Sequence, residues 1–403
     1  MRIAIKRNKI NKFSIIIFFI LYFTVGTLLQ LPAGELLRWG GCVLLAIIGT
    51  KDSFKTRKPF RFFPSYYLYL IVPFVLSMFG HANISVYGTI RFSSFLLLIY
   101  SLYSYYNRKK VDEIYIQKHF EIFAKILCLI TIIQIILLLL NINEFGTFKG
   151  IYDNKNYFTT ISSVSLISSF WLILNNKNYK YSILLISNII LLISTGSRTG
   201  VVSLFIIMLC LPFIIYNGTT LRNILKVMLS IMILGLICIL VLKKIEIPAL
   251  SRLLAPESSD GSTGFERTGY WDAAIPLFKQ KPIFGWGNSA ADYYISNSNT
   301  LYNWGFHNTY LIILVENGII GSFFYSCFFI TGLFKNIKKY IKLDLFADEK
   351  IFVKTLTLIC IVLLINAFTE SFLFAAGNPM AVCFWFSFII LDKYIELKFS
   401  KEP

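Results

Sequence analysis

Charged residues are scarce in this chain, and a soluble protein could not be built from what remains. Only 15% of the 403 residues are charged, whereas 56% are hydrophobic and 17% are aromatic. A soluble globule of this composition would expose far too much apolar surface to water. The sequence therefore predicts that lipid is the main solvent of this protein.

Neither the cysteines nor any metal-binding motif of this chain indicates a function. The seven cysteines lie within apolar stretches, without a CxxC pair or ligand spacing to a histidine, and are typical of small buried hydrophobic residues. There is no HExxH motif, DxD-like pair, Walker loop or GxSxG motif. A metal-dependent or serine-hydrolase mechanism thus has no sequence support, and we expect neither a metal nor a cofactor.

Apolar runs fill most of the chain, and they predict an all-α, polytopic membrane protein. Each is about long enough to cross roughly 30 Å of hydrocarbon at about 1.5 Å per residue. The first lacks a small-residue cleavage site, so we interpret it as a retained span. The twelve predicted spans lie near residues 13–30, 37–50, 63–80, 84–103, 121–140, 157–174, 181–195, 199–216, 225–242, 309–334, 351–368 and 378–392.

The net charge of +18 could suggest a nucleic-acid partner, but the positions of the cations argue against one. With the N-terminus inside, 26 of the 39 Lys and Arg residues fall in inner segments and only ten in outer ones. This distribution is the positive-inside pattern of a polytopic protein. It predicts two cytoplasmic termini, a bilayer as the partner surface and no nucleic acid.

One connection is much longer than the others. It covers residues 243–308 and divides the chain into nine N-terminal spans (1–242), a long outer loop (243–308) and three C-terminal spans (309–403). Its tryptophans and tyrosines are too many to leave solvated, so we expect an ordered segment. Thr263 and Glu266 have capping-box spacing and predict a helix from about Gly264 to Phe278, which Pro276 would kink or shorten. The segment 282–288 is expected to form a tight turn.

Two arginines stand out on the outer side, where cations are disfavoured. Arg198, at the start of the eighth span, would meet an anion together with the free amides of a helix N-terminus. The alternative is an arginine that snorkels to the lipid headgroups. Arg267 has Trp271 one helical turn later, and it would either contact a phosphate or form a salt bridge with a neighbouring carboxylate.

A third arginine and two carboxylates lie within or beside apolar segments. Arg91 is about two turns inside the fourth span, where a guanidinium requires a wet cavity or an anion. Glu316, about 13 Å below the outer end of its helix, is expected to pair with an arginine such as Arg91. Glu370 is shallower and could act as an acid, a base or a hydrogen-bond acceptor for a sugar.

His307 is one of only three histidines, and Asn308 follows it at the predicted start of the tenth span. An imidazole can accept a proton from a sugar hydroxyl near neutral pH or donate a hydrogen bond to a phosphate oxygen. The alternative is an interfacial histidine that only binds a neighbouring residue.

Taken in order, these segments resemble the O-antigen ligase and polymerase superfamily of bacterial membrane glycosyltransferases. The resemblance is carried by Ser197 to Thr199, Arg267 to Trp271, Pro282 to Gly287, His307 to Leu311 and Glu316 to Gly321, together with the twelve-span layout and the long loop. It implies transfer of a glycan from an undecaprenyl-diphosphate donor to a sugar hydroxyl, without a metal or a nucleotide sugar.

The resemblance also implies roles for individual residues. Arg198 and Arg267 would hold the donor diphosphate, and His307 would orient or deprotonate the acceptor hydroxyl. Asn156, in the Asn154-Lys155-Asn156 segment, resembles a family motif on the sugar or lipid side. Trp271 could stack on a sugar ring or pack within the loop.

Three functions follow in order of preference. The first is a polymerase that joins lipid-linked repeat units of O-antigen or capsule, because residues 369–374 and 377–379 look more like polymerases. The second is a ligase that passes the glycan to the lipid A core, and the third is a polysaccharide flippase. The first would act at the outer face of the bacterial inner membrane, beside a chain-length regulator and a flippase.

Overall fold

The computed structural model describes residues 2–23, 34–55, 64–77, 82–140, 148–152, 154–215, 265–290 and 306–401. Within these ranges the chain forms helices and turns and no β-strand, which confirms the all-α prediction. The helices are α1 (Arg2–Phe23), α2 (Gly34–Lys55), η1 (Ser65–Tyr67), α3 (Leu68–Ser77), α4 (Ala82–Tyr106), α5 (Glu113–Leu139), α6 (Lys155–Asn176), α7 (Tyr181–Ser194), α8 (Arg198–Ile215), α11 (Phe265–Gln280), α13 (Thr309–Lys342), α14 (Ala347–Asn366) and α15 (Pro379–Phe399).

The predicted spans coincide with these helices wherever the structure describes them. Residues 225–242, the predicted ninth span, lie outside the described residues. By length and composition alone, three of the described helices can cross a membrane, namely α5, α6 and α13. The predicted count of about twelve spans is therefore not confirmed.

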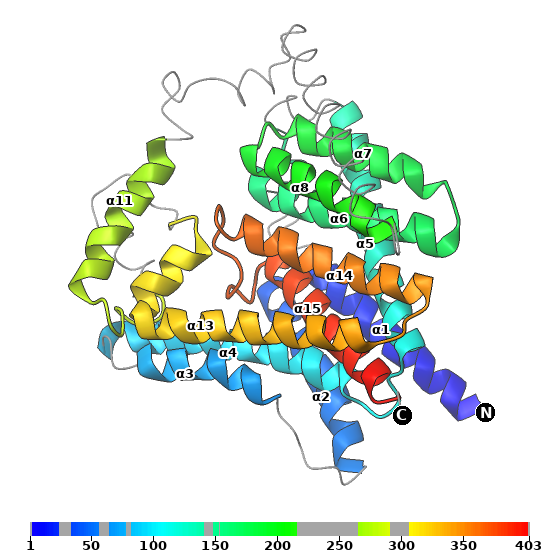
Figure 1. Ribbon diagram of the computed structural model, residues 1–403, viewed down its shortest axis with the longest axis horizontal. Coiled ribbons are helices and arrows are strands. Elements are labelled where there is room, and N and C mark those ends of the chain that lie inside the picture. Colours follow the sequence, from blue (N-terminus) through cyan, green and yellow to red (C-terminus); the bar gives the residue numbers. More distant parts are fainter. Residues whose placement is uncertain are drawn as a thin grey trace, which may run out of the picture.

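The helices form two groups that meet on α15, and α14 packs on α15 and on the second group (Figure 1). One group contains α1–α4 and α13, in which α2 packs on α4 and α3 packs on α13. The other contains α5–α8, in which α6 packs on both α7 and α8. The start of α1 and the end of α15 lie at one end of the molecule, and α11 lies at the opposite end, called here the α11 end (Figure 1).

Helix α15 is the central helix of the molecule. Every residue from Pro379 to Asp392 is buried, and the helix packs against α4, α6, α13 and α14. Asn378 caps its first turn by accepting from the amide of Met380, and Pro379 occupies the first helical position, where its missing N–H costs nothing. A helix that is apolar on every side and buried on every side belongs in the core of a bundle.

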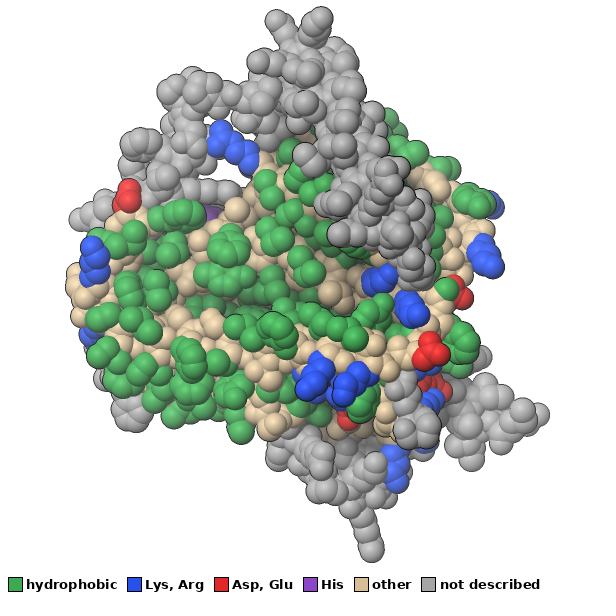
Figure 2. Space-filling model, in the orientation of Figure 1, with side chains coloured by type: hydrophobic (Ala, Val, Ile, Leu, Met, Phe, Trp, Pro, Cys, Tyr) green, Lys and Arg blue, Asp and Glu red, His purple; other side chains and the backbone are tan. Residues whose placement is uncertain are grey.

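The outer surface is apolar over a wide band. Figure 2 shows hydrophobic side chains covering most of the face over α3 and α13, with cations gathered toward the end where the termini lie. The exposed residues of this band include Leu68, Val75, Phe323, Ile330 and Phe334. An apolar surface of this extent is compatible with lipid rather than water as its neighbour.

Polar side chains join helices inside this apolar bundle. The Thr131 hydroxyl of α5 lies 2.8 Å from the Ser165 hydroxyl of α6 and 3.1 Å from the Asn188 Oδ1 of α7. The Asn188 amide also donates to the Leu184 carbonyl in its own helix. Because lipid gives helices no hydrophobic reason to associate, such bonds between helices contribute to holding them together.

Helix α13 is broken near its first third, which the apolar pattern of residues 309–334 does not show. Gly318 has φ 62° and ψ −165°, a conformation far outside the helix. The turn after α11, which the sequence predicts, lies against this break. Its Trp286 amide donates to the Val315 carbonyl at 3.0 Å, and the Ile319 amide donates to the Pro282 carbonyl at 2.8 Å.

The described part of the long loop has its own small hydrophobic core. Ala274, Phe306, Ile312 and Val315 are buried together, with Trp286 packed against them. The Trp286 indole also donates to the Leu277 carbonyl of α11 at 2.7 Å. Helix α11 continues four residues past Pro276 to Gln280, so this proline does not shorten the helix as expected.

We expect Gly318→Ala to destabilise the protein by about 1–3 kcal/mol, because only glycine adopts this backbone region readily. The added methyl group would also lie 2.3 Å from the Ile283 carbonyl oxygen. Gly40→Ala in α2 is the matched control, since a methyl group there meets no atom within 4 Å. Thermal unfolding in detergent should show a lower Tm for Gly318→Ala alone, and equal Tm values would show that the turn does not constrain the break.

Candidate functional site

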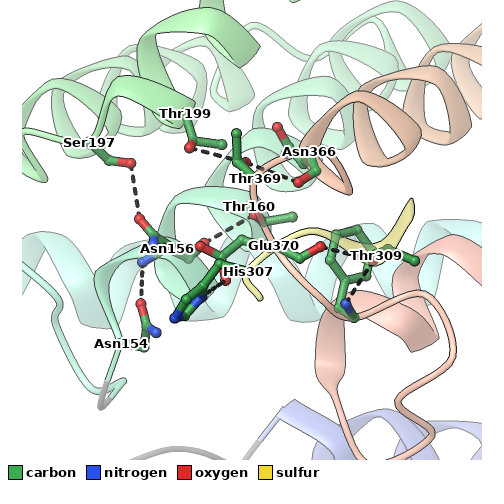
Figure 3. A network of polar contacts seen from close by, with 11 residues as sticks. Asn154, Asn156, Thr160, Ser197, Thr199, His307, Thr309, Asn366, Thr369 and Glu370 are labelled. Atoms are coloured by element: carbon green, nitrogen blue, oxygen red, sulfur yellow. Dashed lines mark hydrogen bonds and ion pairs between the residues drawn. The ribbon is translucent and has the colours of Figure 1, made fainter. Parts of the chain in front are cut away.

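Glu370 is the centre of a buried polar network at the α11 end (Figure 3). It lies in the segment between α14 and α15 and is 2% exposed. Its Oε1 accepts from the Asn156 amide Nδ2 at 2.6 Å, and its Oε2 lies 3.5 Å from His307 Nδ1. The structure thus brings together Asn156, His307 and Glu370, which the sequence analysis selected from three distant segments.

Asn156 connects this carboxylate to the start of α8. It is the second residue of α6, and Asn154 caps that helix by accepting from the Asn156 amide N–H at 2.8 Å. The Asn156 Oδ1 accepts from the Ser197 hydroxyl at 3.2 Å. Because the Asn156 side chain donates on one side and accepts on the other, α6, α8 and the Glu370 segment are fixed relative to one another.

Threonine hydroxyls hold the backbone of the Glu370 segment. The Thr309 hydroxyl, at the start of α13, donates to the Glu370 carbonyl at 2.9 Å and accepts from the Phe372 amide at 3.2 Å. The Thr199 hydroxyl of α8 donates to the Thr369 hydroxyl at 3.2 Å. The position of the carboxylate is therefore set by α8 and α13 as well as by its own loop.

His307 has an unusual backbone conformation that directs its ring. Its φ is 45°, in the left-handed region that side-chain-bearing residues rarely occupy. Asn308 follows and caps α13 by accepting from the amides of Tyr310 and Leu311 at 2.9 and 3.1 Å. Asn308 is thus a structural cap, and the prediction that it binds substrate stays untested.

The His307 imidazole is partly exposed and faces the buried carboxylate of Glu370. The His307 side chain is 22% exposed, whereas that of Glu370 is 3% exposed. An imidazole held through Nδ1 presents Nε2 on the opposite edge of the ring. A carboxylate in this position fixes the ring and stabilises the imidazolium that forms when Nε2 takes up a proton.

Arg198 is the first residue of α8, as predicted, and its side chain is exposed. It follows Ser197 directly, so its backbone position is fixed by the Ser197 contact with Asn156. Arg267 lies in α11, as expected, but its side chain is outside the described residues. The predicted joint action of these two arginines therefore stays a prediction.

The other two predicted residues lie apart from Glu370. Arg91, in α4, donates through Nη1 to the Ser289 hydroxyl at 3.3 Å and lines a separate cavity with Glu316. Both residues line this cavity, and the expected pairing of Glu316 with Arg91 stays a prediction. Trp271 is 45% exposed on α11. Neither the sugar-stacking role nor the packing role of Trp271 is tested by this position.

The hydroxyl residues of the network and one arginine of this region were given no individual role from the sequence. Ser197, Thr199, Thr309 and Thr369 join the network through their hydroxyls, each directly beside a selected residue. Arg38 of α2 is 5% exposed and donates to the Gly377 carbonyl in the segment that follows Glu370. A useful signal was the scarcity of Lys and Arg in the segments predicted to be outer, which singles out Arg38 as well as Arg198.

The described residues contain no group of three or more His, Cys, Asp and Glu side chains that could hold a metal ion. The chemistry that this part of the chain offers is instead proton transfer at an imidazole with a buried carboxylate, next to an exposed guanidinium.

Residues 182–326 match the family model described as O-antigen ligase. Among curated proteins, none matches this chain. The family match confirms, over these residues, the predicted resemblance to the O-antigen ligase and polymerase superfamily. The matched segment contains Arg198, Arg267 and His307, whereas Asn156 and Glu370 lie outside it.

We predict that Asn156→Asp destabilises the protein, because it places a second carboxylate at hydrogen-bond distance from Glu370 in a buried site. The expected loss is on the order of 1–3 kcal/mol. Adding Glu370→Gln should recover most of it, since the pair again consists of one acid and one amide. Thermal unfolding in detergent measures both effects.

Asn176→Asp, at the exposed end of the same helix, is the control and should leave the Tm nearly unchanged. A double variant that is no more stable than Asn156→Asp would contradict the contact between these two side chains.

Proposed function

We propose, from the match to O-antigen ligases, that this protein is a membrane glycosyltransferase that polymerises undecaprenyl-diphosphate-linked repeat units of a surface polysaccharide. The reaction would take place at the outer face of the cytoplasmic membrane, with both termini cytoplasmic. The observation that carries this proposal is the half-exposed His307 on the buried Glu370, beside the exposed Arg198.

The proposed reaction joins a sugar hydroxyl to an anomeric carbon. His307 Nε2 takes the proton from the acceptor hydroxyl, whose oxygen forms the new bond to the anomeric carbon of the donor glycan. The bond from that carbon to the diphosphate oxygen breaks, and undecaprenyl diphosphate leaves with the bonding electrons. Glu370 holds the imidazolium, so the proton has a defined place during transfer.

The guanidinium groups would act on the leaving group. Negative charge grows on the diphosphate as the bond to the sugar breaks, and a cation near a helix N-terminus stabilises that charge. Arg198 stands at such a position, and Arg267 is the second residue that the resemblance implies for this role. No metal or nucleotide sugar is needed for the step as written.

A ligase that transfers the glycan to the lipid A core is the second candidate, since the matching family is described as O-antigen ligase. The same proton transfer serves both reactions, because they differ only in the molecule that carries the acceptor hydroxyl. Residues 369–374 and 377–379 are the basis for preferring a polymerase. A flippase is the third candidate, because broken helices such as α13 are common in transporters.

We expect His307→Ala, Arg198→Ala and Arg267→Ala each to abolish long-chain polysaccharide without lowering the amount of protein. Loss of a general base typically reduces a rate by about 10²–10⁴-fold, and loss of a charge-stabilising group by about 10²–10³-fold. Electrophoresis of surface glycan and immunoblotting of the tagged protein measure the two quantities.

Lys279→Ala is the matched control for Arg267→Ala, because it removes an exposed cation from the same helix, and it should leave chain length unchanged. Normal chain length in all three arginine and histidine variants would end the glycosyltransferase proposal.

A deletion strain separates the three candidate functions. We expect lipid carrying a single repeat unit, which indicates a polymerase. Polymer that accumulates on the undecaprenyl carrier, with no repeat on the core, would identify a ligase instead. Lipid-linked repeat units trapped on the cytoplasmic side would identify a flippase and contradict glycan transfer.

A further inference from the structure

A cavity lies beside the break in α13, apart from the Glu370 network. It has a volume of about 50 Å³ and lies between α4, α13 and the turn after α11. One water molecule requires about 10–15 Å³, so the cavity has room for a few water-sized groups, such as hydroxyls of a larger ligand that enters it in part. Non-helical backbone within a membrane helix is expected only where it is buried in protein or lines a cavity. Gly318 is buried, and the two residues before it, Glu316 and Asn317, line the cavity.

Two amide side chains at this cavity have polar atoms with no hydrogen-bond partner among the described residues. Asn317 is 4% exposed, and its Oδ1 is buried and unsatisfied. The Asn288 Nδ2 on the facing turn is also buried and unsatisfied. A buried acceptor and a buried donor of this kind each cost about 1–3 kcal/mol unless a ligand or water completes them.

The remaining polar groups around the cavity balance in charge. Arg91 contributes a guanidinium, Glu316 a carboxylate, and Ser289 and Tyr325 a hydroxyl each. With the two amides, the cavity offers donors and acceptors in a mixed arrangement and no net charge. This chemistry fits a group that donates and accepts at once, as the hydroxyls of a sugar do, better than it fits an anion.

Aromatic and aliphatic side chains form the rest of the cavity lining. Phe92, Phe374 and Ile313 line the cavity. Carbon–hydrogen faces of a sugar ring pack on such surfaces while its hydroxyls take up the hydrogen bonds, whereas a site for water alone gains nothing from them.

The position of the cavity along α13 relates it to the candidate catalytic site. Asn317 follows His307 by ten residues on the same stretch of chain, about 15 Å along a helix. A ligand in the cavity would therefore lie beyond hydrogen-bond reach of the imidazole. It would belong to another part of the glycan than the reacting hydroxyl.

We propose that the cavity lined by Arg91, Asn288, Ser289, Glu316 and Asn317 binds a neutral sugar unit of the lipid-linked glycan through its hydroxyl groups. The proposal rests on the glycan-transfer function proposed above and adds to it a specificity subsite. In this role the break in α13 exposes Asn317 to the ligand, and the turn after α11 supplies Asn288 from the opposite side.

The test is saturation-transfer NMR of methyl glycosides of glucose, galactose and N-acetylglucosamine on the purified full chain in nanodiscs. We expect at least one glycoside to bind the unaltered protein, and Asn317→Leu to reduce its signal at least tenfold. Asn336→Leu is the matched control, because Asn336 is another buried asparagine of α13, 3% exposed, and its replacement should leave the signal unchanged.

Gly88→Ala is a second variant, and it removes no polar side chain from the cavity. A methyl group at Gly88 would lie 2.4 Å from the Asn288 carbonyl oxygen, so it should push the turn away from the cavity and weaken binding as well. The melting temperature of each variant shows whether it is folded, and binding is compared among folded variants.

Two results would overturn the proposal. One is the absence of binding by all three glycosides, in which case the cavity holds water only. The other is binding that survives Asn317→Leu and Gly88→Ala but is lost in His307→Ala, which would place the sugar at the imidazole. The glycan-transfer function is judged separately, by the chain length of surface glycan in His307→Ala cells.

Discussion

A backbone amide or carbonyl in hydrocarbon has no water to bind, so a membrane helix must satisfy these groups within the protein. In this chain the constraint is most visible at Gly318, where α13 leaves the helical conformation. The turn after α11 supplies what the break removes, since Pro282 accepts from the Ile319 amide and Trp286 donates to the Val315 carbonyl. The long connection is thereby tied to a membrane helix at defined positions.

The same requirement explains why Glu370 is surrounded as it is. A carboxylate at 2% exposure is costly unless it is hydrogen-bonded and paired, and its neighbours provide the Asn156 amide and the His307 imidazole. These partners come from α6 and from the residue pair before α13. The contact between Glu370 and His307 therefore lowers the energetic cost of burying the carboxylate and also orients the half-exposed imidazole.

Helix α13 contributes residues to both the Glu370 network and the cavity beside Gly318. His307 and Asn308 stand at its start, and Glu316 and Asn317 stand at its break. A substrate with a charged diphosphate and a chain of sugars needs a binding site for each part. If one helix contributes to both binding sites, the distance between the two sites stays constant. The division between a reacting end and a recognising end is consistent with the proposed transfer and with the proposed sugar subsite.

The sequence by itself determined the helical class, the apolar stretches and the residue types suited to glycan transfer, because these depend on composition and on local spacing. It also determined α11, the turn that follows it and the start of α8 at Arg198, since capping and turn residues act over a few positions.

Only the tertiary structure decided that Asn156, His307 and Glu370 form one network while Arg91 and Glu316 line a separate cavity. The break in α13 was likewise invisible in the apolar pattern, because Gly318 leaves the helix only where a turn some thirty residues earlier replaces its hydrogen bonds. Contacts between distant segments depend on how helices pack, and no local rule of spacing contains that information.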